Sequence, residues 1–398
     1  MKIVAAFCFV SLIAFCAPAI AQPTSRPPCV VSAEDVRAAG PGCEREWIDA
    51  NLSINELQVV GTAESYKLAP SAALISLIRM GSEDDVRALD YSQPPLQEQL
   101  DAGARSLDFD IAYDPKGGLY KFPAGASMAG ELISDKYIAE MSSPGFKVIH
   151  IIDIDFNSSC TTLEMCLQEV ADWSRSHKDH LPLTIFLRSN DARTPMPGAT
   201  KPAKFDQATF DALDQQIKSI FKPEELITPD DIQGTSASLQ EAVQGHGWPK
   251  VGASRGKILF VLDDTPLKVA VYRGNRHSLE GRAMFIASDG TSPAAAFITV
   301  QNPAKESAAI KRYVHAGFIV HTFADAETKE ARANTSSRRD WAFSSGAQII
   351  STDFLKPDRR LGPYNVRVPG GRTSQCDLEV TKKVCGNLDL EPGSSAGQ

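Results

Sequence analysis

The sequence predicts an α/β protein built as a parallel (β/α)8 barrel, also called a TIM barrel. Short apolar runs recur along the chain, and segments of helical length and periodicity lie in the gaps between them. Several runs are continuous in Val, Ile, Leu and Phe rather than alternating, which is typical of parallel strands buried on both faces. Polar residues gather at the carboxyl ends of the runs, where barrel enzymes place their sites. A doubly wound open sheet is the alternative architecture.

Eight runs are predicted to be strands, and this number favours a closed barrel over an open sheet. The strands are expected at residues 57–60, 106–111, 147–152, 183–187, 257–262, 283–287, 317–320 and 347–351. Helices are expected in the gaps, most clearly at 162–176, 205–221 and 304–315.

The N-terminus has the pattern of a secretory signal peptide. Lys2 gives a short positive region, residues 3–16 are almost wholly apolar, and Ala19-Ile20-Ala21 forms a small-residue cleavage site. We therefore expect a secreted or periplasmic protein. The expected domain plan is a signal peptide at 1–21, a disulfide-clipped leader at 22–50, one barrel domain at 51–389 and a flexible tail at 390–398.

Six cysteines remain after the signal peptide, and an even number in an exported protein favours disulfides. They fall into three couples that are close in sequence, so we expect the pairs 29–43, 160–166 and 376–385. A metal site is the weaker interpretation, because no couple has the spacing or the neighbouring histidine of a zinc site.

The charge balance limits the partners of this protein. The formal net charge is -8, whereas a nucleic-acid binder normally presents a basic face, so nucleic acid is excluded as a partner. The acidic balance also gives no broad attraction to anionic membranes. We therefore expect any contact with a membrane surface to be local and transient.

Two carboxylates on the second predicted strand are candidate metal ligands. Asp108 and Asp110 lie two residues apart, so their side chains point to the same face of the strand. Glu64, just after the first strand, could supply a third carboxylate. Calcium binds such oxygen ligands, so the three residues form a candidate cation site. The alternative is that the aspartates only make local hydrogen bonds and salt bridges.

Other candidate residues lie at the same predicted rim. His150 ends the third predicted strand, and an imidazole there can act as an acid or a base near neutral pH. Arg188 and Asp353 follow the fourth and the last strands and are candidates for contact with substrate. A histidine among apolar neighbours can instead be a satisfied core residue.

Several motifs give the chain a family resemblance. These are Gln58 to Tyr66 with the Asp108-Phe109-Asp110 strand, and the segments 150–166, 318–334, 345–353 and 364–371. From about residue 55 to about residue 385, the chain resembles the calcium-dependent phosphoinositide-specific phospholipase C-like proteins. These belong to the wider superfamily of phospholipase C-like (PLC-like) barrel phosphodiesterases. The resemblance implies a barrel of the PLC-like phosphodiesterase type, calcium as cofactor, and a phosphoinositide or inositol phosphodiester in the cleft.

The resemblance also implies a mechanism and shows where this chain departs from it. In the family, one histidine deprotonates the inositol 2-hydroxyl, a second protonates the leaving oxygen, and calcium stabilises charge on the phosphate. His150 matches the second histidine. Ala63 stands at the position of the first, and Glu64 replaces an asparagine. Arg188 occupies the position of a metal-binding glutamate, which reverses the charge there.

Two further departures concern phosphate binding. Where the family often has arginines on the seventh strand, this chain has His321 and Phe323. Three functions follow from these differences. In the first, the protein binds a phosphoinositide, sugar phosphate or protein in the cleft that active family members use, with weak or no turnover. Alternatively, it is an active phosphodiesterase that uses Glu64, His150 and Arg188, either without a metal or with an altered metal. The third is a glycosidase that uses Glu64, Asp108 and Asp110.

Overall fold

The computed structural model describes residues 28–391 apart from 246, 382 and 387. The predicted signal peptide, the first part of the leader and residues 392–398 of the predicted tail lie outside the described residues. Among the residues described, no helix is both long and apolar enough to span a membrane.

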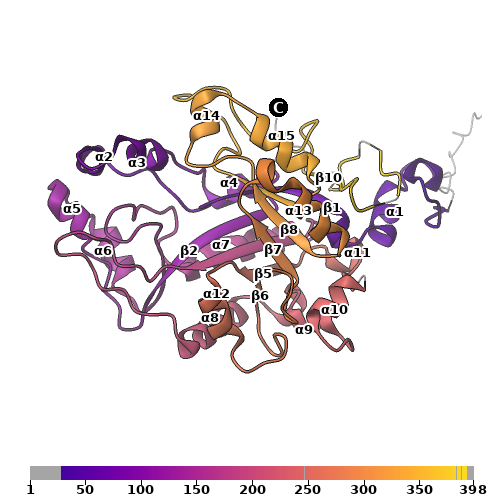
Figure 1. Cartoon of the computed structure of the whole chain (residues 1–398), viewed down its shortest axis with the longest axis horizontal. Helices are drawn as coiled ribbons and strands as arrows, with labels where there is room; N and C mark the ends of the chain where they lie inside the picture. The colour runs from indigo at the N-terminus through magenta and orange to yellow at the C-terminus, as the bar shows by residue number, and fades with distance from the viewer. Residues whose placement is uncertain (1–27, 246, 382, 387, 392–398) are drawn as a thin grey trace, which may run out of the picture.

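A nearly closed parallel barrel forms the centre of the protein, as predicted (Figure 1). Within the described part of the chain, eight strands run parallel in the order β6-β5-β4-β2-β1-β9-β8-β7. A single parallel bridge between Ala287 and Phe297 joins the two ends of this order. The strands are β1 (Leu57–Thr62), β2 (Ser106–Asp114), β4 (Leu183–Ser189), β5 (Ile258–Leu262), β6 (Phe285–Ile286), β7 (Phe297–Val300), β8 (Ile319–Phe323) and β9 (Ile349–Thr352).

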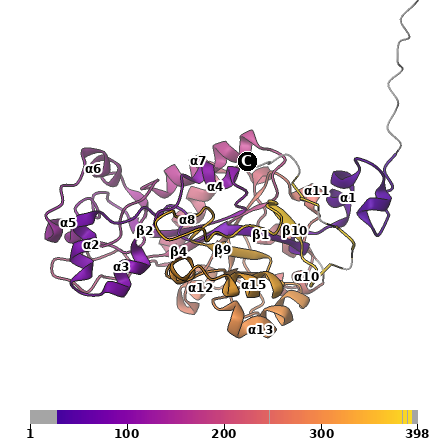
Figure 2. The same ribbon diagram turned by 90° about the horizontal axis from the view of Figure 1, so that it is seen from above.

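Helices surround the barrel, and a further group of helices lies beyond it on one side. The three helices predicted from periodicity are present as α7 (Leu163–Ser176), α8 (Gln207–Ile220) and α13 (Pro303–His315). In Figures 1 and 2, α2, α3, α5 and α6 form a lobe at the left, opposite α1. The other helices are α1 (Glu44–Asn51), α2 (Ala72–Arg79), α3 (Glu83–Leu89), α4 (Leu96–Asp101), α5 (Ala124–Ala129), α6 (Asp135–Met141), α9 (Pro229–Gln233), α10 (Leu239–Gln244), α11 (Val251–Ser254), α12 (Pro266–Arg273), α14 (Lys329–Ala333) and α15 (Ser337–Ser344).

The predicted number of barrel strands is correct, but one member of the predicted set is wrong. Residues 147–152 do not form a barrel strand. Instead β3 (Gly145–Val148) pairs antiparallel with the outer part of β2, and His150 lies in the loop that follows. The eighth barrel strand is β7, which the sequence analysis missed. An apolar run predicts an extended segment, but it does not say which neighbour the segment pairs with.

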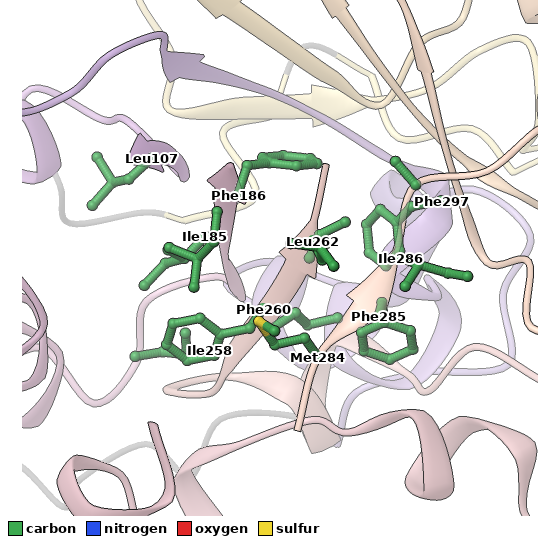
Figure 3. Packing of buried hydrophobic residues seen from close by; sticks show 14 of the residues in the cluster. Leu107, Ile185, Phe186, Ile258, Phe260, Leu262, Met284, Phe285, Ile286 and Phe297 are labelled. Carbon is green, nitrogen blue, oxygen red and sulfur yellow. The ribbon is translucent and has the colours of Figure 1, made fainter. Parts of the chain in front are cut away.

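The barrel interior is filled with large side chains rather than open. Figure 3 shows Phe186, Leu262 and Phe297 among the buried residues of this cluster. The rings of Phe186 and Phe297 meet edge to face, with centroids 6.3 Å apart. Packing of this kind leaves the carboxyl ends of the strands as the place where polar side chains reach solvent.

The three predicted disulfides are all present: Cys29–Cys43, Cys160–Cys166 and Cys376–Cys385. The last of them ties down a C-terminal strand, β10 (Ser374–Cys376), which pairs antiparallel with β1. Leu390 and Glu391, which the sequence analysis assigned to the flexible tail, are buried. Glu391 forms an ion pair with the buried Arg105 and accepts a hydrogen bond from the Leu181 amide at 2.9 Å.

Gly61 is the residue that lets β1 approach β2 closely. A Cβ atom at this position would lie 2.4 Å from Ser106 Cβ and 2.7 Å from the Ser106 carbonyl oxygen. We predict that Gly61→Ala lowers the free energy of unfolding by about 1–3 kcal/mol, the range typical of overpacking. Urea unfolding measures the change. Gly81→Ala, where the nearest atom is 3.4 Å away, is the control and should change stability much less. Equal effects of the two substitutions would contradict the prediction.

Candidate active site at the barrel rim

The turn after β1 directs Glu64 across the mouth of the barrel. The Ser65 amide donates to the Asp108 carbonyl at 3.0 Å, and Ser65 Oγ accepts from the Asp108 amide at 2.9 Å. These bonds fix the turn against β2. Glu64 itself has φ of 43°, in the left-handed region that side chains other than glycine seldom adopt. Such strain is found most often at functional sites.

Glu64 and His150 form a direct ion pair. Glu64 Oε1 lies 2.9 Å from His150 Nε2, and both side chains keep about a fifth of their surface exposed, 20% and 22%. The other ring nitrogen, His150 Nδ1, lies 2.8 Å from Asp155 Oδ2. Asp155 is fully buried and also contacts Lys67 Nζ at 2.8 Å. The imidazole is therefore held between two carboxylates.

The two partners of this pair shift each other's pKa in opposite directions. Burial lowers the pKa of His150, but the charges and hydrogen bonds of Glu64 and Asp155 outweigh it and hold the pKa well above its usual value. Burial likewise raises the pKa of Glu64, but the charge of His150 outweighs it, so the pKa falls to about 2. His150 is thus a protonated imidazolium at neutral pH, and Glu64 is an ionised carboxylate.

Tyr91 links Glu64 to Asp353. Its hydroxyl lies 2.6 Å from Glu64 Oε2 and 3.1 Å from Asp353 Oδ1. Burial and the charge of Asp325 raise the pKa of Asp353 well above its usual value. Because the hydroxyl has a single proton, a neutral Asp353 can donate to Tyr91 while Tyr91 donates to Glu64. Asp353 therefore takes part in the hydrogen-bond network of the rim rather than standing as a free anion.

Arg188 lies among the carboxylates on the other side of the mouth. Its Nη2 donates to Asp108 Oδ2 at 3.0 Å, and its Nη1 lies 3.7 Å from Asp110 Oδ1. A third carboxylate, Asp263, lies 3.9 Å away. Burial raises the pKa of Asp108 to about 7 although the charge of Arg188 opposes it. The guanidinium side chain remains 36% exposed, so it can also reach an anion from solvent.

His321 does not replace the phosphate-binding arginine expected at its position. It is completely buried, and its ring stacks on Phe186 with centroids 4.1 Å apart. Its Nε2 lies 2.8 Å from Ser351 Oγ. Burial, with a smaller effect of the charge of Arg188, lowers the pKa of His321 to about 3. A neutral buried imidazole offers little attraction to phosphate.

A cavity of ≈ 480 Å³ opens beside Asp263, between the ends of β5, β6 and β7. Its lining includes Asp264, Ser288, Asp289 and Thr299 as well as apolar residues of α12 and β6. This volume lies within the range of small-molecule sites, about 300–1,000 Å³. A ligand held at the rim therefore has space on the β5–β7 side.

The predicted calcium ligands do not fit calcium in this arrangement. Calcium takes six to eight oxygen ligands, but Asp108 already accepts from Arg188, and Asp110 accepts from Tyr66 at 2.9 Å. The charge of Arg188 would also repel a cation bound between Asp108 and Asp110. Glu64 lies with His150 and not with Asp108. Within the described residues, the group of rim side chains that could hold a metal is Glu64, Asp110 and His150.

The structure thus brings all the predicted rim residues to one mouth, but in two groups. Glu64, His150 and Asp353 belong to one network, and Asp108 and Arg188 to the other. Asp110 lies between them, 3.7 Å from Arg188 and within 4.8 Å of donor atoms of Glu64 and His150. Three residues of these networks were missed: Lys67, Tyr91 and Asp155. Asp155 lies in the 150–166 motif and Lys67 directly follows the first motif, so both had a weak signal. Tyr91 lies in no motif, and only the tertiary structure identifies it.

The Glu64–His150 pair predicts a specific loss of stability in acid. Because the folded pKa of Glu64 is about 2 and its ordinary value is 4.5, its contribution is present above pH 4.5 and is lost as the pH falls toward 2. We predict that the melting temperature of the wild type falls more than that of Glu64→Gln between about pH 5.5 and about pH 3. Glu224→Gln, at an exposed position, is the control and should follow the wild type. Parallel curves for wild type and Glu64→Gln would refute the prediction.

The position of Arg188 allows a prediction about calcium binding. We expect weak or no calcium binding in the wild type, measured by titration calorimetry. Arg188→Glu should gain calcium binding, because the substitution removes the repelling charge and adds a carboxylate beside Asp108 and Asp110. Arg188→Gln removes the charge without adding a ligand and should gain less. Micromolar calcium binding by the wild type would show that the arginine does not exclude the cation.

Comparisons with known proteins agree with this fold. A family model described as calcium-dependent phosphoinositide phospholipase C matches residues 52–377. Among solved structures, the chain is similar to the apo form of a calcium-dependent phosphoinositol-specific phospholipase C from the Gram-negative bacterium Pseudomonas sp. That match has 17% identity and a TM-score of 0.50, and it covers 83% of this chain and 96% of that chain.

A calcium-dependent phosphatidylinositol-specific phospholipase C from Streptomyces antibioticus also matches. It has 16% identity and a TM-score of 0.47, with 76% of this chain and 94% of that chain covered. No curated protein matches. At 17% identity the Pseudomonas structure supports the fold alone, whereas the family model covers most of the chain. The chain belongs to the calcium-dependent phosphoinositide phospholipase C family.

Proposed function

We propose that this protein is a phospholipase C-like phosphodiesterase that binds an inositol phosphodiester at the barrel rim and cleaves it slowly, without calcium. The observation that carries the proposal is the imidazole of His150, held between Glu64 and Asp155, in a chain that has alanine at position 63. His150 can serve as the proton donor of the family reaction. The position of the proton-accepting histidine holds Ala63, which cannot act as a base.

His150 is suited to protonate a leaving oxygen. Its raised pKa keeps it charged at neutral pH, and its side chain is 22% exposed at the rim, so a substrate oxygen could take the place of Glu64 at Nε2. Asp155 fixes the ring through Nδ1, so the proton on Nε2 points toward the mouth. In this proposal Glu64 orients His150, since a carboxylate with a pKa of about 2 is a weak base.

Arg188 is suited to hold the phosphate. Its guanidinium group is partly exposed, and its planar donors match two phosphate oxygens. Asp108 and Asp110 hold the Arg188 side chain in place, and their negative charges offset part of its positive charge. Such an arrangement favours a diester, with one negative charge, over a phosphate monoester with two. Asp353 would act through Tyr91 and Glu64 rather than by contact with the substrate.

Supplying the missing base is the sharpest test of this function. We predict that Ala63→His raises turnover of phosphatidylinositol by ~10²–10⁴, the usual contribution of a positioned base. The assay uses phosphatidylinositol in detergent micelles and soluble glycerophosphoinositol, each with calcium and with chelator. Turnover of both the wild type and the variant should be insensitive to chelator.

Two controls separate catalysis from a change in binding. Ala63→Gln adds a side chain of similar reach without a base and should show no gain. The gain should disappear in Ala63→His/His150→Gln, because that double variant has a base but no acid. If wild-type turnover already depends on calcium, or if Ala63→His has no effect on a folded protein, the proposed function is wrong.

We also propose that the protein is secreted or periplasmic. Three disulfides support this location, because such bonds persist in oxidising compartments. The signal-peptide pattern of residues 1–21 adds to it. Cell fractionation would test the location, and a protein retained in the cytosol would contradict it.

A further inference from the structure

We propose that Glu64, Asp110 and His150 form a binding site for a divalent transition metal ion of the zinc type. This set differs from the expected calcium ligands, because it contains an imidazole nitrogen and leaves out Asp108. It depends only on the geometry of the rim. Because an ion at His150 Nε2 displaces the proton that the proposed reaction uses, that reaction belongs to the metal-free protein, and the metal-bound form should not perform it.

The three donor groups already converge. One ligand atom from each of Glu64, Asp110 and His150 lies within 4.8 Å of the other two. Bonds of about 2.1 Å in a tetrahedral site place donor atoms about 3.4 Å apart. The 2.9 Å between Glu64 Oε1 and His150 Nε2 therefore has to open by only a small side-chain rotation. Two carboxylates and one imidazole are a donor set that zinc accepts.

Each proposed ligand is oriented by a second, buried group. Asp155 contacts His150 Nδ1 at 2.8 Å, which is the carboxylate–histidine arrangement typical of metal sites. Tyr66 donates to Asp110 Oδ2 at 2.9 Å, and Tyr91 donates to Glu64 Oε2 at 2.6 Å. These bonds leave Asp110 Oδ1 and Glu64 Oε1 as the donor atoms for the ion, and Asp110 Oδ1 also lies 3.7 Å from Arg188 Nη1.

The charges around the mouth favour a cation on this side. The carboxylates of Glu64, Asp108, Asp110, Asp155 and Asp263 outnumber the cationic groups of Arg188, His150 and Lys67. Arg188 neutralises the half of the mouth that contains Asp108 and repels a hard cation there. A metal ion at His150 would take the place of the Nε2 proton, which leaves to solvent, and would add one positive charge.

An ion in this position would keep an open coordination place. Glu64 and His150 are partly exposed to solvent, whereas Asp110 is buried. Three protein ligands and one position open to water are the arrangement of catalytic zinc sites. Water or a phosphate oxygen could occupy that position, next to Arg188. The part of this inference that concerns phosphate rests on the proposed function.

Metal binding to the full mature chain, prepared without an affinity tag and stripped with chelator, tests the site. We expect calorimetry with Zn²⁺ to show one ion per chain, and Co²⁺ to give the visible absorption of a four-coordinate site. X-ray absorption of the zinc protein should show a single imidazole ligand. His150→Gln and Asp110→Asn should each abolish the tight site, and Asp155→Asn should weaken it about 10–100-fold.

Two matched variants keep the three ligands and serve as controls. Asp84→Asn removes an exposed carboxylate far from the site in the sequence, and His177→Ala removes an exposed histidine. Both should bind zinc as the wild type does, and circular dichroism confirms that every variant is folded. Absence of stoichiometric zinc in the wild type would overturn the proposal. So would zinc binding that survives in both His150→Gln and Asp110→Asn, since the ion would then be an adventitious ion only.

Discussion

The carboxylate of Asp155 lies fully buried between Lys67 and His150, and the arrangement of the rim depends on it. A buried charge is costly unless charged and hydrogen-bonding partners surround it, so these three residues have to come together when the protein folds. Lys67 lies just after β1, whereas His150 and Asp155 lie in the loop after β3. Backbone bonds between Ser159 and Tyr66, and between Leu68 and Asn157, join the same two segments. The buried charges thus fasten the loop that carries His150 onto the end of the first strand.

This fastening explains the orientation of the candidate catalytic pair. With Nδ1 of His150 bound to Asp155, its Nε2 has to face the mouth, where the left-handed turn places Glu64. The second half of the mouth is organised independently around Arg188. In the family pattern a glutamate stands at the position of Arg188, on β4, and arginines stand at the positions of His321 and Phe323, on β8. Here the arginine is on β4, and His321 is neutral and buried. The positive charge of the site has therefore moved across the barrel.

Much of the fold could be predicted, because it follows from local patterns. Buried strands give continuous apolar runs, long helices give periodic ones, and cysteines close in sequence pair when their loops are short. Pairing between strands does not follow from such patterns. The run at 147–152 is extended only in part, and it turns back on β2 because β2 continues to Asp114, beyond the barrel rim. The short strand β7 was missed although Phe297 and Val300 are buried in the barrel.

The sequence alone determined the barrel, the three disulfides and the position of the rim, and its family resemblance predicted an alanine at the place of a catalytic histidine. It also identified the candidate residues one by one, since each follows a strand or lies on one. Only the tertiary structure decided which of them meet. Glu64 turns to His150 rather than to Asp108, because its backbone adopts φ of 43° and because Arg188 already occupies the aspartates. Side-chain direction after a strand depends on such turns and on charges from distant segments, and neither is visible in the spacing of residues.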